Sequence, residues 1–147
     1  MRFLIQSTEL RRLLSTAATC VEKGASISIN RCILLQAHEG GLRATATDKG
    51  MTYLGNFSAN VEIPGEVAID AANALQVAKV LPNDVVSVQL GDNYRIDVKC
   101  GKSAYKLAGQ TASEFQPTPS FEVSGSLQIQ AADLRRIIDQ THFSIAP

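Results

Sequence analysis

The sequence predicts an α+β fold in which two helices pack on antiparallel β-sheets. Three observations support this prediction. Two segments carry apolar residues at helical spacing, and the segments around them alternate apolar and polar residues as half-buried strands do. The strand and helix that open the chain also occur a second time near its end. With 147 residues, 45% of them hydrophobic, the chain is long enough to bury one core.

The first predicted elements are a strand over residues 1–6 and an amphipathic helix after it. Ser7 is expected to cap the helix and Gly24 to end it, with Lys23 in the last turn. The opposite face of the helix should be polar and weakly basic. The apolar stripe is made by Leu10, Leu13, Leu14, Ala17 and Val21, and the polar face by Arg12, Ser15, Thr16 and Thr19.

Strands are predicted over the next segment of the chain. Residues 32–37 and 42–47 flank a Glu-Gly-Gly turn and should form a hairpin. Residues 51–63 keep a period of two and are expected to form one long strand, with a possible bulge at Gly55. Pro64 and Gly65 then turn the chain.

A second helix is predicted over residues 71–81, with Asp70 as its N-cap and Lys79 on its polar side. Residues 85–90 and 94–100 form a second expected hairpin, and residues 103–108 a further strand. The segment 110–120 is rich in Thr, Ser and Pro and is typical of a linker.

The repeat appears after this linker. Residues 9–14, Glu-Leu-Arg-Arg-Leu-Leu, align without a gap with residues 133–138, Asp-Leu-Arg-Arg-Ile-Ile. A strand over 126–130 and a helix over 131–140 are therefore expected. Chance similarity is the alternative, because such helix starts are common, but the Arg-Arg pair and the matching upstream strand favour a repeat. Upstream, Phe3, Ile5 and Gln6 align with Leu127, Ile129 and Gln130.

The domain boundaries follow from the repeat. Residues 1–119 are expected to form a complete first domain, and residues 120–147 the truncated start of a second. A single strand and helix cannot bury their apolar faces alone. We therefore expect the chain to be a fragment or a truncated relative of a longer repeat protein.

Composition excludes several classes of protein. Fourteen basic and fourteen acidic residues leave no net charge, which argues against a strongly basic nucleic-acid binder but allows charge of one sign to gather on one face. Three widely spaced cysteines and two histidines predict no metal site and a reduced, cytoplasmic protein. We expect no membrane span, because no apolar run approaches the ~20 residues required.

The residues offer little catalytic chemistry. Asp48 lacks a nearby histidine or second carboxylate, so we expect it to cap a turn. Cys100, between Lys99 and Lys102, is the better of the candidate thiol nucleophiles, but a buried structural role is expected. The Gly40-Gly41 pair lacks the features of a phosphate-binding loop. We predict no active site and no cofactor. Two-faced helices with scattered cations instead suit sequence-independent contact with phosphates.

The whole chain resembles the bacterial sliding clamps, the beta subunits of DNA polymerase III. The residues that carry the resemblance are the Met1-Arg2-Phe3 start with its helix, the segments 33–42 and 46–48, Leu81-Pro82 with 88–90, the strand 101–107, the lead-in 114–117 and the helix 134–146.

The resemblance implies a DNA clamp fold and a processivity factor that encircles duplex DNA without reading its sequence. It also implies a non-catalytic protein, a head-to-tail ring dimer, and partners in the polymerase III catalytic subunit and the clamp loader. By position in the family, Arg12, Lys23, Lys79 and Arg136 would face DNA. Lys102, Tyr105 and Leu107 would meet another protomer.

The chain also departs from the family. The Arg and the Leu-Pro-Ile-Leu run that commonly follow the first helix are replaced by residues 23–30, where Lys23 is the nearest basic residue. Ala72 and Asn73 stand where basic residues are common, which weakens the positive charge of the inner surface. The alternative hypothesis is a free-standing α+β interaction module or small enzyme unrelated to DNA.

Overall fold

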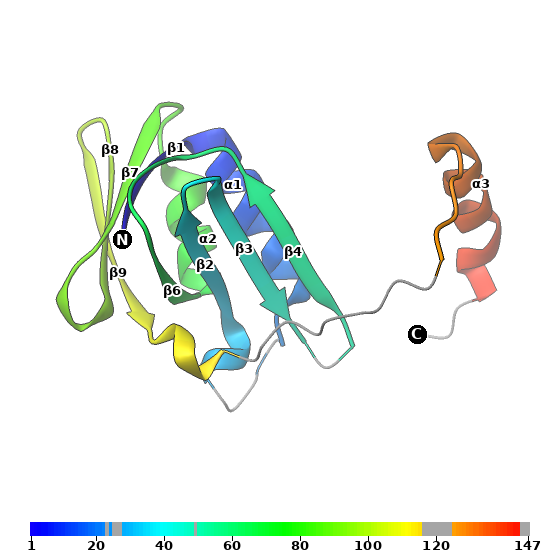
Figure 1. Ribbon diagram of the computed structural model, residues 1–147, viewed down its shortest axis with the longest axis horizontal. Helices are drawn as coiled ribbons and strands as arrows, with labels where there is room; N and C mark the ends of the chain where they lie inside the picture. The colour runs from blue at the N-terminus through cyan, green and yellow to red at the C-terminus, as the bar shows by residue number, and fades with distance from the viewer. Residues whose placement is uncertain (23, 25–27, 49, 116–124, 145–147) are drawn as a thin grey trace.

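The computed structural model describes residues 1–22, 24, 28–48, 50–115 and 125–144. These residues form one nine-stranded antiparallel sheet and three α-helices (Figure 1). The strands are β1 Arg2–Gln6, β2 Cys32–His38, β3 Gly41–Thr47, β4 Thr52–Phe57, β5 Asn60–Ile63, β6 Gly65–Asp70, β7 Val85–Leu90, β8 Arg95–Cys100 and β9 Ser103–Gln110. The helices are α1 Ser7–Ala17, α2 Ala71–Val80 and α3 Ala131–Thr141.

The sheet consists of two halves that meet at a narrow junction. Its strand order is β4-β3-β2-β6-β9-β8-β7-β1-β5, and β6 pairs with β9 through only two residue pairs, Ala68 with Gln110 and Ile69 with Gly109. Over residues 103–108, β9 pairs with β8 alone among the described strands. Much of one edge of β9 is therefore open.

Helices α1 and α2 pack beside each other against the sheet (Figure 1). The predicted stripe of α1 is confirmed for Leu10, Leu13, Leu14 and Ala17, which are buried. Val21, its fifth predicted member, lies beyond the helix in extended backbone and is half-buried. On α2 the buried residues are alanines, which let the helix lie close to its neighbours. The two helices thus cover a core that includes Phe3, Leu13, Ile33, Leu42 and Ile96.

Strand β2 is buried on both faces, unlike most of the sheet. One face of β2 joins the main core, and Cys32 and Leu34 on the other join a small second cluster. Phe115, from the segment after β9, is 9% exposed and covers this second cluster. A strand that is covered on both faces reads as a nearly continuous apolar run, as residues 32–37 do apart from Gln36.

The boundaries of α1 differ from those predicted. Ser7 is the first residue of the helix rather than its cap, and Gln6 precedes it without a side-chain capping bond. The Ser7 N–H instead donates to the Asp84 carbonyl (3.0 Å), and its Oγ accepts from the Asp84 N–H (3.3 Å). The helix ends at Ala17, well before Gly24, and a 3₁₀ turn over Ala18–Cys20 follows.

The predicted long strand over 51–63 is wrong. It is divided into β4 and β5, which lie at opposite ends of the strand order. Gly55 pairs regularly with Ala44 and forms no bulge. A Cβ at this position would collide with the Tyr53 hydroxyl, so glycine serves close side-chain packing here.

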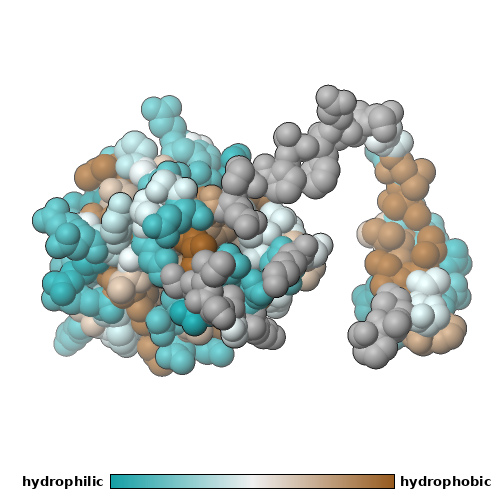
Figure 2. Space-filling view, turned by 90° about the horizontal axis from the view of Figure 1, so that it is seen from below, coloured by the Kyte–Doolittle hydropathy of each residue, from teal (hydrophilic) through white to brown (hydrophobic). Residues whose placement is uncertain are grey.

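The second helix begins as predicted. Asp70 precedes α2, and its Oδ1 accepts from the Asn73 N–H at 2.9 Å. By contrast, the strand expected over 126–130 does not form, because no described strand pairs with this segment. The helix that follows it, α3, buries none of its residues. Its apolar residues are visible as a brown surface in Figure 2.

Candidate nucleic-acid interface

Arg12 lies on the exposed face of α1, as the helical pattern predicts. Its side chain is 65% exposed, and its Nη2 donates to Glu9 Oε2 at 2.6 Å. The guanidinium carbon also lies 5.2 Å from the centre of the Phe57 ring on β4. Arg12 is therefore accessible to a ligand and held by two neighbours.

Arg11 has a structural role that the sequence pattern did not reveal. It is half-buried, and it donates from Nε to the Ala78 carbonyl (3.2 Å) and from Nη2 to the Leu81 carbonyl (3.1 Å). Carbonyls at the end of a helix lack partners within the helix. Arg11 thus satisfies the end of α2 and joins it to α1.

The exposed face of α2 carries little charge. Lys79 lies there in the last turn, together with Ala72, Asn73 and Gln76. Lys23, the fourth residue predicted to face DNA, lies outside the described residues. The DNA-facing roles of Arg12, Lys23, Lys79 and Arg136 all remain predictions.

Helix α3 reproduces the local structure of α1. Both helices have 11 residues, and each follows a glutamine with φ −66° and ψ 136°. Each is followed by a 3₁₀ turn, Ala18–Cys20 after α1 and His142–Ser144 after α3. The Glu9–Arg12 pair has its equivalent in Asp133 and Arg136, whose Oδ1 and Nη2 are 3.2 Å apart. The repeat seen in the sequence therefore extends to backbone geometry and to the polar face.

The residues predicted to meet another protomer lie on or beside the open strand. Tyr105 and Leu107 are on β9, half-buried and packed against the main core. Lys102 is exposed in the turn between β8 and β9. Tyr105 and Leu107 are alternate residues of one strand and share a face of the sheet, whereas Lys102 precedes the strand. The role of the three residues in an interface remains a prediction.

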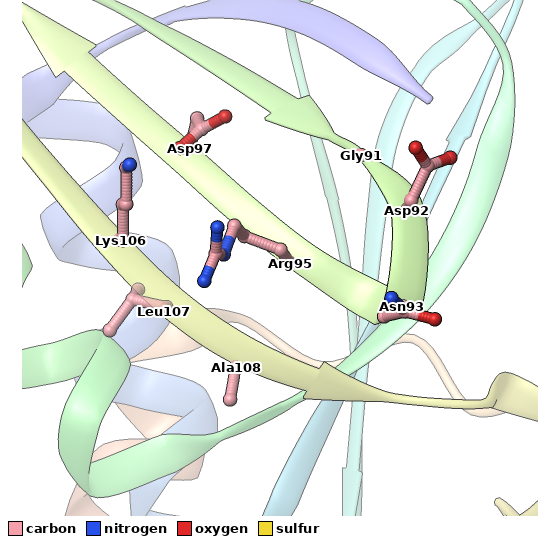
Figure 3. A pocket seen from close by; sticks show the side chains of 8 residues that line it. All are labelled: Gly91, Asp92, Asn93, Arg95, Asp97, Lys106, Leu107 and Ala108. Carbon is pink, nitrogen blue, oxygen red and sulfur yellow. The ribbon is translucent and has the colours of Figure 1, made fainter.

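A hollow of about 650 Å³ lies near the turn between β7 and β8. Figure 3 shows the side chains that line this hollow, among them Arg95, Asp97 and Lys106. Of its lining residues, the sequence pattern had assigned a role only to Leu107, and the turn contains two residues with positive φ, Asn93 (53°) and Tyr94 (56°). The lining mixes two cations with two carboxylates, and it holds no cysteine, serine or histidine. Its full lining is Gly91, Asp92, Asn93, Arg95, Asp97, Lys106, Leu107 and Ala108.

The candidate catalytic residues have structural roles. Asp48 caps a turn as predicted, with its Oδ1 accepting from the N–H groups of Gly50 and Met51 at 2.8 Å each. Burial raises the pKa of Cys32 to about 11, and the nearby Asp70 charge adds to the shift. Burial, followed by the Asp84 charge, also raises the pKa of Cys100. Both thiols are therefore protonated at neutral pH and are poor nucleophiles.

Two further observations concern only the described part of the chain. Its His, Cys, Asp and Glu side chains do not gather into a group of three or more that could hold a metal ion. None of its helices has the length and apolar character needed to cross a membrane.

Two helices lie side by side on an antiparallel sheet, each with a polar outer face. Crystal structures of DNA polymerase sliding clamps superpose on this arrangement with TM-scores of 0.91 and 0.92, so the fold is of the DNA clamp class. The family model described as the DNA polymerase III beta subunit, N-terminal domain, matches residues 1–119. The chain therefore belongs to the DNA polymerase III beta subunit family.

Individual relatives agree with this assignment. The beta sliding clamp of Caulobacter vibrioides is 28% identical over 148 residues, and that of Vibrio cholerae is 29% identical over 147 residues. Each alignment covers 99% of this chain and 40% of the relative. The crystal structure of the sliding clamp from Caulobacter crescentus superposes with a TM-score of 0.92 at 28% identity, over 99% of this chain and 40% of that one. The chain thus spans about 40% of the length of these relatives.

Proposed function

We propose that this chain supplies the first domain, residues 1–119, and the start of the second, residues 120–147, of a ring that encircles duplex DNA. The ring would act in the cytoplasm as a non-catalytic processivity factor that tethers the catalytic subunit of DNA polymerase III after a clamp loader places it on DNA. Membership of the beta subunit family over residues 1–119 is the observation that carries this proposal.

The polar helix faces support a sequence-independent contact with DNA. Arg12, Lys79 and Arg136 are exposed and lie on helices, where their charges can meet phosphates. Phosphate contacts position a protein on a duplex without reading its bases. Lys23 belongs to the same proposed set by its place in the sequence.

The open edge of β9 supports closure of the ring. Free backbone N–H and C=O groups over residues 103–108 can pair with a strand of another protomer. Tyr105 and Leu107 would bury the rest of their apolar surface in that contact, and Lys102 would lie at its margin. A head-to-tail arrangement of protomers then closes into a ring.

A chimera tests the proposal. This chain would replace the aligned 40% of the Caulobacter vibrioides beta sliding clamp, and the product would be loaded on nicked circular plasmid by the matching clamp loader. We expect the ring to co-elute with circular DNA in gel filtration and to dissociate once the plasmid is linearised. The intact Caulobacter clamp is the positive control. A chimera that sediments as a ring dimer but does not stay on circular DNA would refute the proposal.

A further inference from the structure

The two arginines proposed to face DNA each carry their own carboxylate. Glu9 Oε2 lies 2.6 Å from Arg12 Nη2, and Asp133 Oδ1 lies 3.2 Å from Arg136 Nη2. Both pairs have the i,i+3 spacing that puts two side chains on one face of a helix. Because α1 and α3 are copies of one unit, the same ion pair has been placed twice on the same polar face.

Arg12 is held in this pair by a second contact. Its guanidinium lies against the Phe57 ring of β4, at 5.2 Å from the ring centre. An arginine over an aromatic face is attracted by the ring quadrupole. The Glu9 carboxylate and the Phe57 ring together keep Arg12 on the surface of the domain, with part of its donor capacity already used.

The charge left on the first two helices is small. Arg11 is engaged by the carbonyls of Ala78 and Leu81, and Arg12 is neutralised by Glu9. Among the described residues of α1 and α2, this leaves Lys79 as the only cation with neither an acidic nor a carbonyl partner. On the exposed faces of the two helices, the Lys79 charge is therefore the one that no carboxylate offsets among the described residues.

We infer that Glu9 and Asp133 are built-in counter-charges that keep the contact of Arg12 and Arg136 with DNA weak, an inference that rests on the proposed function. A phosphate that approaches either guanidinium meets a carboxylate beside it. The phosphate and the carboxylate must then share the N–H donors of the arginine. Fewer counterions are then released from the DNA, and the contact is shorter-lived. Weak contact suits a ring that is retained by enclosure and must move along the duplex.

The test measures binding of the 147-residue chain to a short fluorescent duplex by anisotropy, at several salt concentrations from about 50 to 200 mM. The variant Glu9→Gln/Asp133→Asn removes both carboxylates and keeps the side-chain shapes. The matched control Glu39→Gln/Asp92→Asn makes the same two chemical changes in turns away from the helices.

We expect Glu9→Gln/Asp133→Asn to bind about threefold to tenfold more tightly at low salt. Its plot of log affinity against log salt should be steeper by up to about 1.8, since each phosphate contact contributes about 0.9. The control should stay within about twofold of the unmodified chain, as expected for charges distant from the contact. Any of three results would overturn the inference. The salt dependence of Glu9→Gln/Asp133→Asn could be unchanged, the control could gain as much affinity, or neither variant could bind the duplex.

A third variant separates this inference from the proposed function. Arg12→Gln/Arg136→Gln should bind more weakly than the unmodified chain and show a flatter salt dependence. If it binds unchanged, the DNA-facing roles in the proposed function fail. If it binds more weakly while Glu9→Gln/Asp133→Asn gains nothing, the counter-charge inference alone is wrong. Circular dichroism of every variant checks that helix content is preserved.

Discussion

Arg11 and Arg12 are neighbours in the sequence, yet the fold gives them different partners. Adjacent residues on a helix point about 100° apart, so one can face a second helix while the other faces solvent. Arg11 reaches the carbonyls of Ala78 and Leu81, whereas Arg12 pairs with Glu9 within its own helix. An Arg-Arg pair in a sequence does not reveal this division, because the position of α2 is a tertiary fact.

Replacement of each arginine by methionine tests the division. Arg11→Met keeps the aliphatic stem and removes the donors, leaving helix-end carbonyls without their partner. We expect the free energy of unfolding to fall by about 1.5–3 kcal/mol, the range for hydrogen bonds to charged groups. The exposed Arg12→Met should cost less than about 1 kcal/mol. Urea denaturation measures both, and equal losses would contradict the structural role of Arg11.

The side chains that cap helices and turns were predicted correctly where their hydrogen bonds are local in the sequence. Asp70 and Asp48 cap as predicted because their bonds go to N–H groups two or three residues away. Ser7 does not cap, because its Oγ is taken by Asp84, 77 positions further along the chain. Hydrogen bonds within one turn are encoded locally, and those between distant segments depend on packing.

The elements themselves were largely predictable from periodicity, and their connections were less so. The hairpins and the buried faces of α1 and α2 follow the pattern of apolar residues. The division of residues 51–63 into β4 and β5 does not, because a period of two continues across the break at Ser58. A side-chain pattern reports which face is buried, but not which neighbouring strand it pairs with.

The junction between β6 and β9 gives a test at this scale. A Cβ on Gly109 would lie 2.6 Å from Val67 Cγ2 and 3.0 Å from the Tyr94 carbonyl oxygen. We expect Gly109→Ala to lower the free energy of unfolding by about 1–3 kcal/mol, because crowding here forces the two half-sheets apart.

Gly91→Ala is the matched control for Gly109→Ala, since the nearest atom to its Cβ is 3.7 Å away. Its cost should be about 0.5 kcal/mol or less. Thermal or urea unfolding of the two variants distinguishes them, and a Gly109→Ala protein as stable as Gly91→Ala would show that the junction tolerates a side chain.

At the scale of the whole molecule, the open edge of β9 predicts self-association. Exposed backbone donors and acceptors beside half-buried Tyr105 and Leu107 invite pairing with a second copy. We expect sedimentation velocity to show oligomers that increase with concentration.

Leu107→Lys should shift the chain toward monomer, because it places a charge in the apolar contact that Tyr105 and Leu107 would make with a second copy. Ala104→Lys adds the same charge at an exposed position of the same strand and serves as the control. Sedimentation as a strict monomer at high concentration, or undiminished association of Leu107→Lys, would argue against the proposed interface.

The repeated helix separates what the sequence determined from what tertiary structure decided. The sequence alone determined that a helix with an apolar stripe follows residue 6 and that a similar helix begins near residue 131, since this pattern depends on residues within a few positions. The end of α1 at Ala17 and the bonds of Ser7 to Asp84 were not predicted. Only the tertiary structure buried the stripe of α1, where Leu13 is fully covered, and left that of α3 exposed, where Ile137 is 47% exposed. Burial requires a sheet and a second helix to pack against, and these are contributed by residues far along the chain.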